Sequence, residues 1–249
     1  MSITRHSFIG ALVVVVLLAG SIVQGEEGAP KRIMIYGDSN TWGWIPVLTG
    51  TTSRYPGAVR WTGVLRAALG PEYEVIDEGL SARTTDVPDP TLPQISGAGL
   101  DGSAYLPAAL ASHLPLNLVV IMLGTNDTKK MFGRTPLRIS LGMGKLIDIV
   151  AHTQGGVGTG YPAPKVLVLC PPPLGTVAPE ARAERWAGGV EKSKALPPYY
   201  EAIAKAGKAE FLDVGTLTAT DGIDGIHLTP AAHKALGTSV SKKVKEILQ

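Results

Sequence analysis

The stretch RIMIYGDS, residues 32–39, contains the pattern on which the fold of this chain depends. An apolar run of strand length, residues 32–36, ends at Gly37-Asp38-Ser39, where a tight turn can place the serine hydroxyl at the edge of a sheet. Four further apolar runs of this kind follow, at residues 73–77, 118–123, 165–169 and 210–214. Because a motif or loop begins where each run ends, we expect five strands that lead into the polar motifs.

Between these runs, apolar residues recur with the spacing of amphipathic helices. This spacing is clear in residues 61–69, 137–151 and 236–247, and Thr229-Pro230 is a start signal for the last helix. Alternating strands and helices imply right-handed crossovers and a parallel sheet covered by helices on both faces. We therefore predict an α/β fold whose ligand site lies beyond the carboxyl ends of the strands.

The composition indicates one catalytic domain with a sizeable core. The chain has 249 residues, of which 45% are hydrophobic and 18% charged. Its 23 Lys and Arg residues nearly balance its 21 Asp and Glu residues, and the basic residues form no stripe. Nothing electrostatic therefore points to a nucleic acid or an anionic membrane surface, and a small, weakly charged or neutral substrate fits better.

The first 25 residues have the pattern of a signal peptide for export. Arg5 and His6 precede an apolar run at residues 8–23, and small residues that follow form a cleavage site. The run is short for a membrane span of about 20 residues, and no Cys stands at the junction to receive a lipid. We expect an exported protein, periplasmic or secreted, without a stable membrane anchor after processing, and a catalytic domain at residues 26–249. An uncleaved N-terminal anchor is the alternative.

Three further polar motifs complete a set with the serine motif: EGLSAR at residues 78–83, GTND at 124–127 and DGIH at 224–227. Together the four supply a nucleophile, oxyanion donors and an acid-base pair, which acyl transfer through a covalent serine ester requires. Each motif alone has an ordinary structural interpretation, such as a helix cap for Ser39 or a turn for Asn126. Their combination favours catalysis.

The spacing suggests a role for each candidate residue. His227 stands three residues after Asp224, so the carboxylate can hold the imidazole in the tautomer that accepts a proton from Ser39. Asn126 follows a predicted buried strand, which places its amide at the same sheet edge as Ser39 as an oxyanion donor. Backbone N–H groups of Ser39 and of residues 79–83 would complete the oxyanion hole.

The remaining acids and histidines have simpler interpretations. Asp38 and Asp127 are expected to fix turns, and His113, His152 and His233 to be surface or capping residues. The sequence predicts no metal site, because residues 221–225 lack the alternating acidic residues of a calcium loop. Residues 158–163 precede a predicted strand, which argues against a nucleotide-binding loop.

The order of the four motifs resembles that of the SGNH (GDSL) hydrolases. Longer runs, at residues 60–65, 78–85, 122–129 and 220–227, are similar to the acyltransferase/arylesterase group of that family, known from mycobacteria. The resemblance implies a flavodoxin-like, three-layer α/β/α fold with a five-stranded parallel sheet and no cofactor. It also implies hydrolysis or alcoholysis of short acyl esters, with water or an alcohol as acceptor, and a homo-oligomer, in that group an octamer.

The resemblance further implies a Ser39-His227-Asp224 triad and an oxyanion hole formed by Ser39, Ala82 and Asn126. Ala82 stands where the family has Gly, and its backbone N–H can serve equally well if its dihedral angles are ordinary.

Three residues beside the motifs, Asn40, Trp44 and Ile226, are expected to contact the substrate. Asn40 replaces the family's usual Leu and would put a polar group beside the acyl pocket. Trp44, with Trp42 and Trp186, could form an apolar surface that favours an alcohol over water.

Three hypotheses of function follow. The first is a serine esterase that cleaves short-chain aryl or alkyl esters, with possible acyl transfer to alcohols. The second is a carbohydrate O-deacetylase, which export favours. The third is a noncatalytic binding module that retains the fold.

Overall fold

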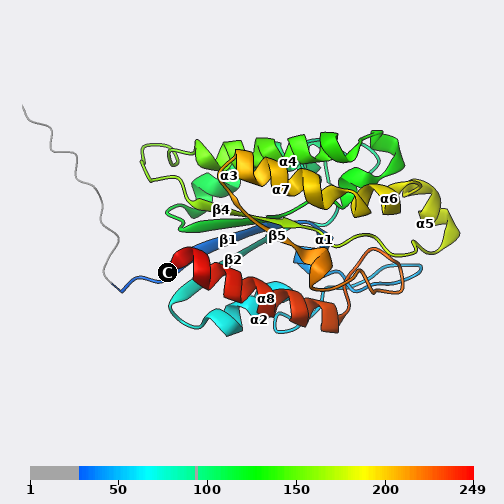
Figure 1. Cartoon of the computed structure of the whole chain (residues 1–249), viewed down its shortest axis with the longest axis horizontal. Helices are drawn as coiled ribbons and strands as arrows, with labels where there is room; N and C mark the ends of the chain where they lie inside the picture. Colours follow the sequence, from blue (N-terminus) through cyan, green and yellow to red (C-terminus); the bar gives the residue numbers. More distant parts are fainter. Residues whose placement is uncertain (1–27, 93–94) are drawn as a thin grey trace, which may run out of the picture.

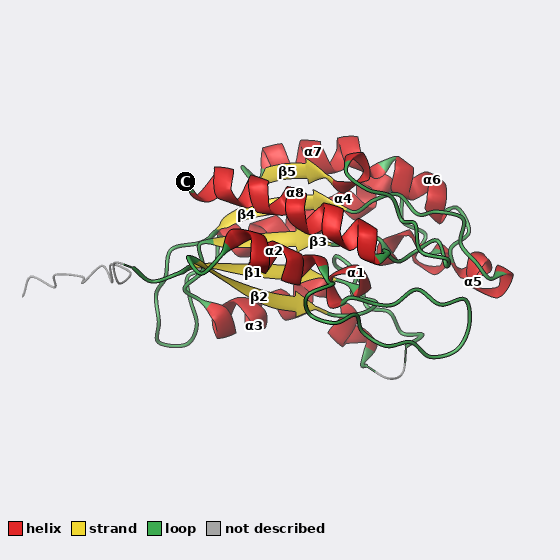
Figure 2. Ribbon diagram, turned by 90° about the horizontal axis from the view of Figure 1, so that it is seen from below, coloured by secondary structure: helices red, strands yellow, loops and turns green. Residues whose placement is uncertain are grey.

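Five parallel strands form the centre of the structure, a computed structural model that describes residues 28–92 and 95–249. The strands are β1 (Lys31–Gly37), β2 (Tyr73–Gly79), β3 (Leu118–Met122), β4 (Lys165–Cys170) and β5 (Glu210–Asp213). Their order in the sheet is β2-β1-β3-β4-β5, and every neighbouring pair is parallel (Figure 2). The five predicted strands and the predicted parallel sheet are thus confirmed. The predicted signal peptide, residues 1–25, lies outside the described residues.

Helices cover both faces of the sheet and make three layers (Figure 1). On one face lie α2 (Trp61–Leu69) and α8 (Pro230–Leu248), and on the other α3 (Gly102–His113), α4 (Pro136–Ala151) and α7 (Leu196–Ala206). Shorter helices stand near the site end of the molecule: α1 (Ser39–Trp42), α5 (Glu180–Arg185) and α6 (Gly189–Lys194). The 3₁₀ turns are η1 (Gly97–Leu100), η2 (Asn126–Thr128), η3 (Lys130–Phe132) and η4 (Val214–Thr216).

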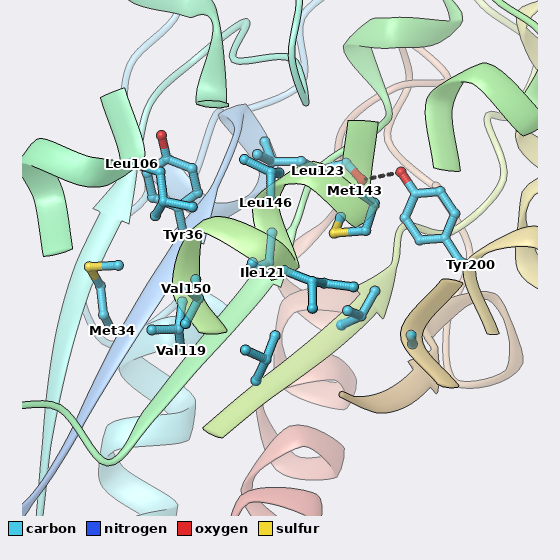
Figure 3. Packing of buried hydrophobic residues seen from close by; sticks show 14 of the residues in the cluster. Met34, Tyr36, Leu106, Val119, Ile121, Leu123, Met143, Leu146, Val150 and Tyr200 are labelled. Atoms are coloured by element: carbon cyan, nitrogen blue, oxygen red, sulfur yellow. Dashed lines mark hydrogen bonds between the residues drawn. The ribbon is translucent and has the colours of Figure 1, made fainter. Parts of the chain in front are cut away.

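The core has two halves, one on each face of the sheet, because side chains of a strand alternate between faces. In β1, Met34 and Tyr36 pack toward α3, α4 and α7, whereas Ile33 and Ile35 pack toward α2 and α8. Figure 3 shows the first half, where the buried Tyr200 hydroxyl donates a hydrogen bond of 2.9 Å to a backbone carbonyl just after β3. Every residue of β3 is buried, as expected for a strand with helices on both faces.

Helix starts follow the capping signals. The Thr229 hydroxyl accepts a hydrogen bond from the backbone N–H of Ala232, and Pro230 occupies the first turn of α8, as predicted. This cap fixes the point at which the chain leaves the loop of His227 and enters the helix. Within the part of the chain that the structure describes, no helix has both the length and the hydropathy needed to cross a bilayer.

The strand order places the switch in direction between β1 and β3, whose following helices lie on different faces of the sheet. In open α/β sheets a ligand binds at such a point, beyond the carboxyl ends of the strands. Ser39 follows β1 and Asn126 follows β3, so both stand at this position.

Candidate active site

Ser39 is the first residue of α1, directly after the turn that ends β1. The Asp38 carboxylate caps α1 by accepting a hydrogen bond of 3.0 Å from the backbone N–H of Asn40, so Asp38 fixes the turn as predicted. A Cβ at Gly37 would lie 2.1 Å from the Thr41 hydroxyl, so the turn accepts only glycine. Ser39 itself is not the cap, which removes its simplest structural explanation.

His227 lies between Ser39 and Asp224. Its Nε2 is 3.0 Å from the Ser39 Oγ, and its Nδ1 is 2.7 Å from Oδ2 of Asp224. The other carboxylate oxygen of Asp224 accepts hydrogen bonds of 3.0 Å from the backbone N–H groups of Ile226 and His227. An imidazole held in this way through Nδ1 presents Nε2 as a base to the hydroxyl.

The surroundings set the charge states of these groups. Burial lowers the pKa of His227 below its ordinary 6.5, although Asp224 opposes the effect. Burial alone would raise the pKa of Asp224, but hydrogen bonds from His227 and the backbone outweigh it and lower that pKa. A neutral imidazole beside an ionised carboxylate is therefore the state at neutral pH. Burial also raises the pKa of Asp38, next to Ser39, to about 7.

Arg182 contacts Asp224, the candidate acid of the triad, and the sequence analysis did not identify this contact. From α5, its Nη1 donates hydrogen bonds to Oδ2 of Asp224 at 3.3 Å and to the carbonyl of Val47 at 3.0 Å. The two charged residues are 42 positions apart, and no spacing in the sequence relates them. The guanidinium lowers the pKa of His227 further, because a nearby cation disfavours the imidazolium.

The tryptophans divide between the pocket and the surrounding loops. The Trp44 ring stacks on the His227 ring, with centroids 5.2 Å apart and an interplanar angle of 17°. Trp44 and Trp186 both line the pocket, whereas Trp42 packs against the guanidinium of Arg54. Trp44 thus limits the rotation of the imidazole and also forms part of the pocket wall.

Asn126 and Ala82 line the same pocket as Ser39 and His227. Gly124 lets the chain turn sharply after β3, since its φ is +120° and a Cβ there would lie 2.2 Å from the Tyr200 hydroxyl. The Asn126 amide then donates a hydrogen bond of 3.2 Å to the Arg83 carbonyl, which orients it. Three segments that carry the expected oxyanion donors, Ser39, Ala82 and Asn126, therefore line one pocket.

Ala82 does not have ordinary dihedral angles. Its φ is +69°, in the left-handed region that favours glycine, so the condition under which alanine would serve as well as glycine is not met. The buried Arg83 holds the strained loop, because its guanidinium donates to the carbonyls of Gly37 and Glu78 and stacks over the Tyr36 ring. The ends of β1 and β2 are thereby tied to the residue that follows Ala82.

The side chain of Asn40 is not placed to contact a substrate, contrary to the expectation. It is buried, and its amide donates a hydrogen bond of 3.1 Å to the carbonyl of Ile226 and accepts one of 3.1 Å from the N–H of Leu228. Asn40 therefore holds the residues on both sides of His227. Of the three expected substrate contacts, only Trp44 and Ile226 line the pocket.

Two structural expectations also need correction. Asp127 does not fix a local turn: its carboxylate is buried and bonds to Thr85 and Arg134, which ties the loops after β2 and β3 together. His233 is fully buried, so its expected place at the surface was wrong, but its Nδ1 accepts a hydrogen bond of 3.2 Å from the N–H of Trp61, the first residue of α2, in agreement with the alternative of a capping residue. His113 and His152 do stand at helix ends, and neither lines the pocket.

The pocket has a volume of about 430 Å³ and a largely apolar surface. It is lined by Ser39, Trp44, Ser81, Ala82, Leu92, Ile95, Leu100, Asn126, Lys129, Arg182, Arg185, Trp186, Ile226 and His227. Among the described residues, no group of three or more His, Cys, Asp or Glu side chains is arranged to hold a metal ion.

Comparison with known proteins places this site among ester hydrolases. Residues 35–235 match the model of the GDSL-like Lipase/Acylhydrolase family. The aryl esterase of M. smegmatis is 50% identical, with 87% of this chain and 99% of that chain covered and a TM-score of 0.83. A carbohydrate acetylesterase from Sinorhizobium meliloti is 51% identical, with the same coverage and TM-score.

A second protein from Sinorhizobium meliloti, a carbohydrate acetylesterase family member, is 36% identical, with 88% of this chain and 99% of that chain covered and a TM-score of 0.80. The comparison with curated proteins found no match.

Proposed function

The chain belongs to the GDSL-like lipase/acylhydrolase family and is a carboxylic ester hydrolase, and we propose that it cleaves short acyl esters through an acyl-enzyme on Ser39. The observation that supports this is the continuous line of hydrogen bonds from the Ser39 Oγ through His227 to Asp224, at 3.0 and 2.7 Å. Neither distance requires any movement before a proton can be transferred.

In the proposed reaction His227 Nε2 takes the proton of Ser39 as its Oγ attacks the ester carbonyl. The oxyanion receives hydrogen bonds from the backbone N–H groups of Ser39 and Ala82 and from the Asn126 amide. His227, now an imidazolium stabilised by Asp224, protonates the leaving alkoxide. Water or a second alcohol then attacks the acyl-enzyme by the same steps in reverse.

The balance between hydrolysis and transfer depends on how well the pocket holds an alcohol in place of water. Trp44, Trp186 and Ile226 supply apolar surface close to His227, which supports transfer as a secondary activity. We retain export and assembly into a homo-oligomer, the octamer of the related group included, as proposals. An oligomer would be detected by light scattering on the mature protein.

A carbohydrate O-deacetylase is the second candidate, supported by the 51% identity to a carbohydrate acetylesterase. It uses the same Ser39 chemistry and differs only in the alcohol that leaves. Release of acetate from acetylated sugars, compared with release from an aryl acetate, distinguishes the two. A noncatalytic binding module, the third hypothesis, does not agree with membership of a hydrolase family with the Ser-His-Asp set in place.

The test is Ser39→Ala with 4-nitrophenyl acetate as substrate. We expect kcat to fall by about 10⁴-fold or more, as for other serine hydrolases that lose the nucleophile. The matched control is Ser81→Ala. Ser81 lines the same pocket, but its hydroxyl has no hydrogen-bond partner among the described residues and so no histidine to act as its base. A fluorophosphonate should label the wild type and Ser81→Ala but not Ser39→Ala. Survival of most activity in Ser39→Ala would refute the assignment.

A further inference from the structure

Part of the wall of this pocket is cationic. Lys129, Arg182 and Arg185 line the pocket, and among its described lining residues none is Asp or Glu. The charge of Arg182 is met by the carboxylate of Asp224. Lys129 and Arg185 share the single carboxylate of Asp89, so that one positive charge on this wall is not balanced.

Asp89 has no oxygen to offer a ligand. It is fully buried, and its Oδ1 accepts two hydrogen bonds from Thr91, at 3.1 and 2.6 Å. Its Oδ2 accepts from the Lys129 ammonium at 2.9 Å and from the Arg185 guanidinium at 3.2 Å. Burial alone would raise the pKa of Asp89, but these hydrogen bonds outweigh it and lower that pKa to about 2. The carboxylate is therefore ionised and fully occupied.

The two cations, in contrast, have donors to spare. Lys129 is only 3% exposed, and within the described residues its ammonium, with three donors, makes one hydrogen bond, to Asp89. The Nε of Arg185 is buried and has no partner among the described residues. Trp186 lies beside them, with its ring centroid 5.7 Å from the Lys129 Nζ. Among the described side chains of this part of the wall, Lys129 and Arg185 thus present N–H donors and a positive charge.

From this geometry we propose that Lys129 and Arg185 form a subsite for a carboxylate, and that the preferred ester of this enzyme carries a carboxylate on the part that reaches them. The inference rests on the proposed function, since it concerns the same pocket. A sugar hydroxyl carries no charge, so it would leave the extra positive charge of Lys129 and Arg185 unbalanced. A carboxylate only accepts, and it would balance the extra charge in a buried setting, where charge-assisted hydrogen bonds are strong.

Local charge therefore differs from the charge of the whole chain. The near balance of 23 basic and 21 acidic residues indicated a weakly charged or neutral substrate. The net charge describes the whole chain, whereas the pocket that contains Ser39 is lined by three cationic residues and, among its described lining, no acidic one.

The test uses two pairs of esters, with rates corrected for spontaneous hydrolysis. For the alcohol part, 4-acetoxybenzoate is compared with phenyl acetate; for the acyl part, 4-nitrophenyl hydrogen succinate is compared with 4-nitrophenyl pentanoate. We expect kcat/KM to be about tenfold or more higher for the anionic member of at least one pair, in line with hydrogen bonds to a charged group.

The variant is Lys129→Met, which keeps the length of the side chain and removes its charge. We expect it to lower the ratio of kcat/KM for the anionic ester to kcat/KM for its neutral partner about tenfold, mainly through a higher KM for the anionic ester. Lys130→Met is the matched control, because Lys130 is adjacent, exposed and outside the pocket. Loss of the ion pair with Asp89 lowers the melting temperature in either case, so the ratio of the two rates is the test. A purely structural role of Lys129 would reduce both rates equally, which would overturn the subsite.

A second measurement needs no variant. Benzoate should inhibit hydrolysis of phenyl acetate by the wild type competitively and at least about tenfold better than benzamide. Equal inhibition, or a preference for neutral esters or acetylated neutral sugars over both anionic esters, would overturn the proposal. These outcomes leave the proposed function intact as long as Ser39→Ala abolishes turnover of phenyl acetate. If Ser39→Ala retains that activity, the proposed function itself fails.

Discussion

Replacement of Ala82 by glycine should stabilise the protein without loss of activity. Ala82 has φ +69°, a conformation that costs an L-residue about 1–2 kcal/mol and costs glycine almost nothing. Glycine also lowers the free energy of unfolding by about 0.5–1 kcal/mol, because it gives the unfolded chain more conformational freedom. The difference is a gain of about 0.5–1 kcal/mol in the free energy of unfolding. For a chain of this size that corresponds to a rise in Tm of about 1–4 °C.

The activity of Ala82→Gly should stay close to that of the wild type. The proposed oxyanion donor is the backbone N–H, which glycine retains in the same conformation. Arg83 and its hydrogen bonds to the carbonyls of Gly37 and Glu78 still hold the loop, so the extra freedom of glycine is small in the folded state. We expect kcat for phenyl acetate within about threefold of the wild type, far from the hundredfold or greater loss typical of a missing oxyanion donor.

Thermal unfolding and steady-state kinetics on the same preparations give both quantities. Lys208→Gly is the matched control, because Lys208 is the other described non-glycine residue with positive φ, at +55°, and it lies outside the pocket. It should gain similar stability with no change in kcat. The reasoning is refuted if Lys208→Gly raises Tm while Ala82→Gly lowers it, or if Ala82→Gly loses a hundredfold in kcat.

Two further predictions concern the residues that hold the imidazole. The acid limb of the pH profile of kcat/KM should fall below pH 6.5, because activity needs neutral His227 and burial lowers its pKa. In Arg182→Gln that limb should move to higher pH, since the cation that disfavours the imidazolium is gone; a limb that stays or moves to lower pH contradicts this. Asn40→Leu should lower the free energy of unfolding by about 1–3 kcal/mol and reduce kcat more than it changes KM, because it leaves the Ile226 carbonyl and the Leu228 N–H unpaired. Denaturant melts and kinetics test it, and wild-type values in both would show that Asn40 does not hold the loop.

The sheet could be predicted from the sequence because its strands are buried on both faces and therefore appear as continuous apolar runs. The helices α3 and α7 could not. α3 contains Pro107 inside its span, and α7 opens with Leu196 followed by two prolines, which are typical of a loop. In the first turn of a helix, however, a proline loses no hydrogen bond, because the backbone N–H groups there have no partner within the helix. That explains α7. Pro107 lies inside α3, so in α3 packing on the sheet, and not the local sequence, decides the structure.

Some residues of the candidate site could likewise be predicted from the sequence, and others could not. Ser39, Asn126 and His227 could be found because each follows a strand or precedes a helix whose end the sequence marks, so topology alone brings them to one edge. Arg182 and the pair of Lys129 and Arg185 stand on segments whose contacts depend on how long loops pack, and their partners are tens of residues away with no fixed spacing. The triad defines the reaction class, and the residues that only the structure brings together form the walls that meet the substrate. The chemistry is thus encoded in local motifs, while specificity depends on long-range packing that periodicity does not report.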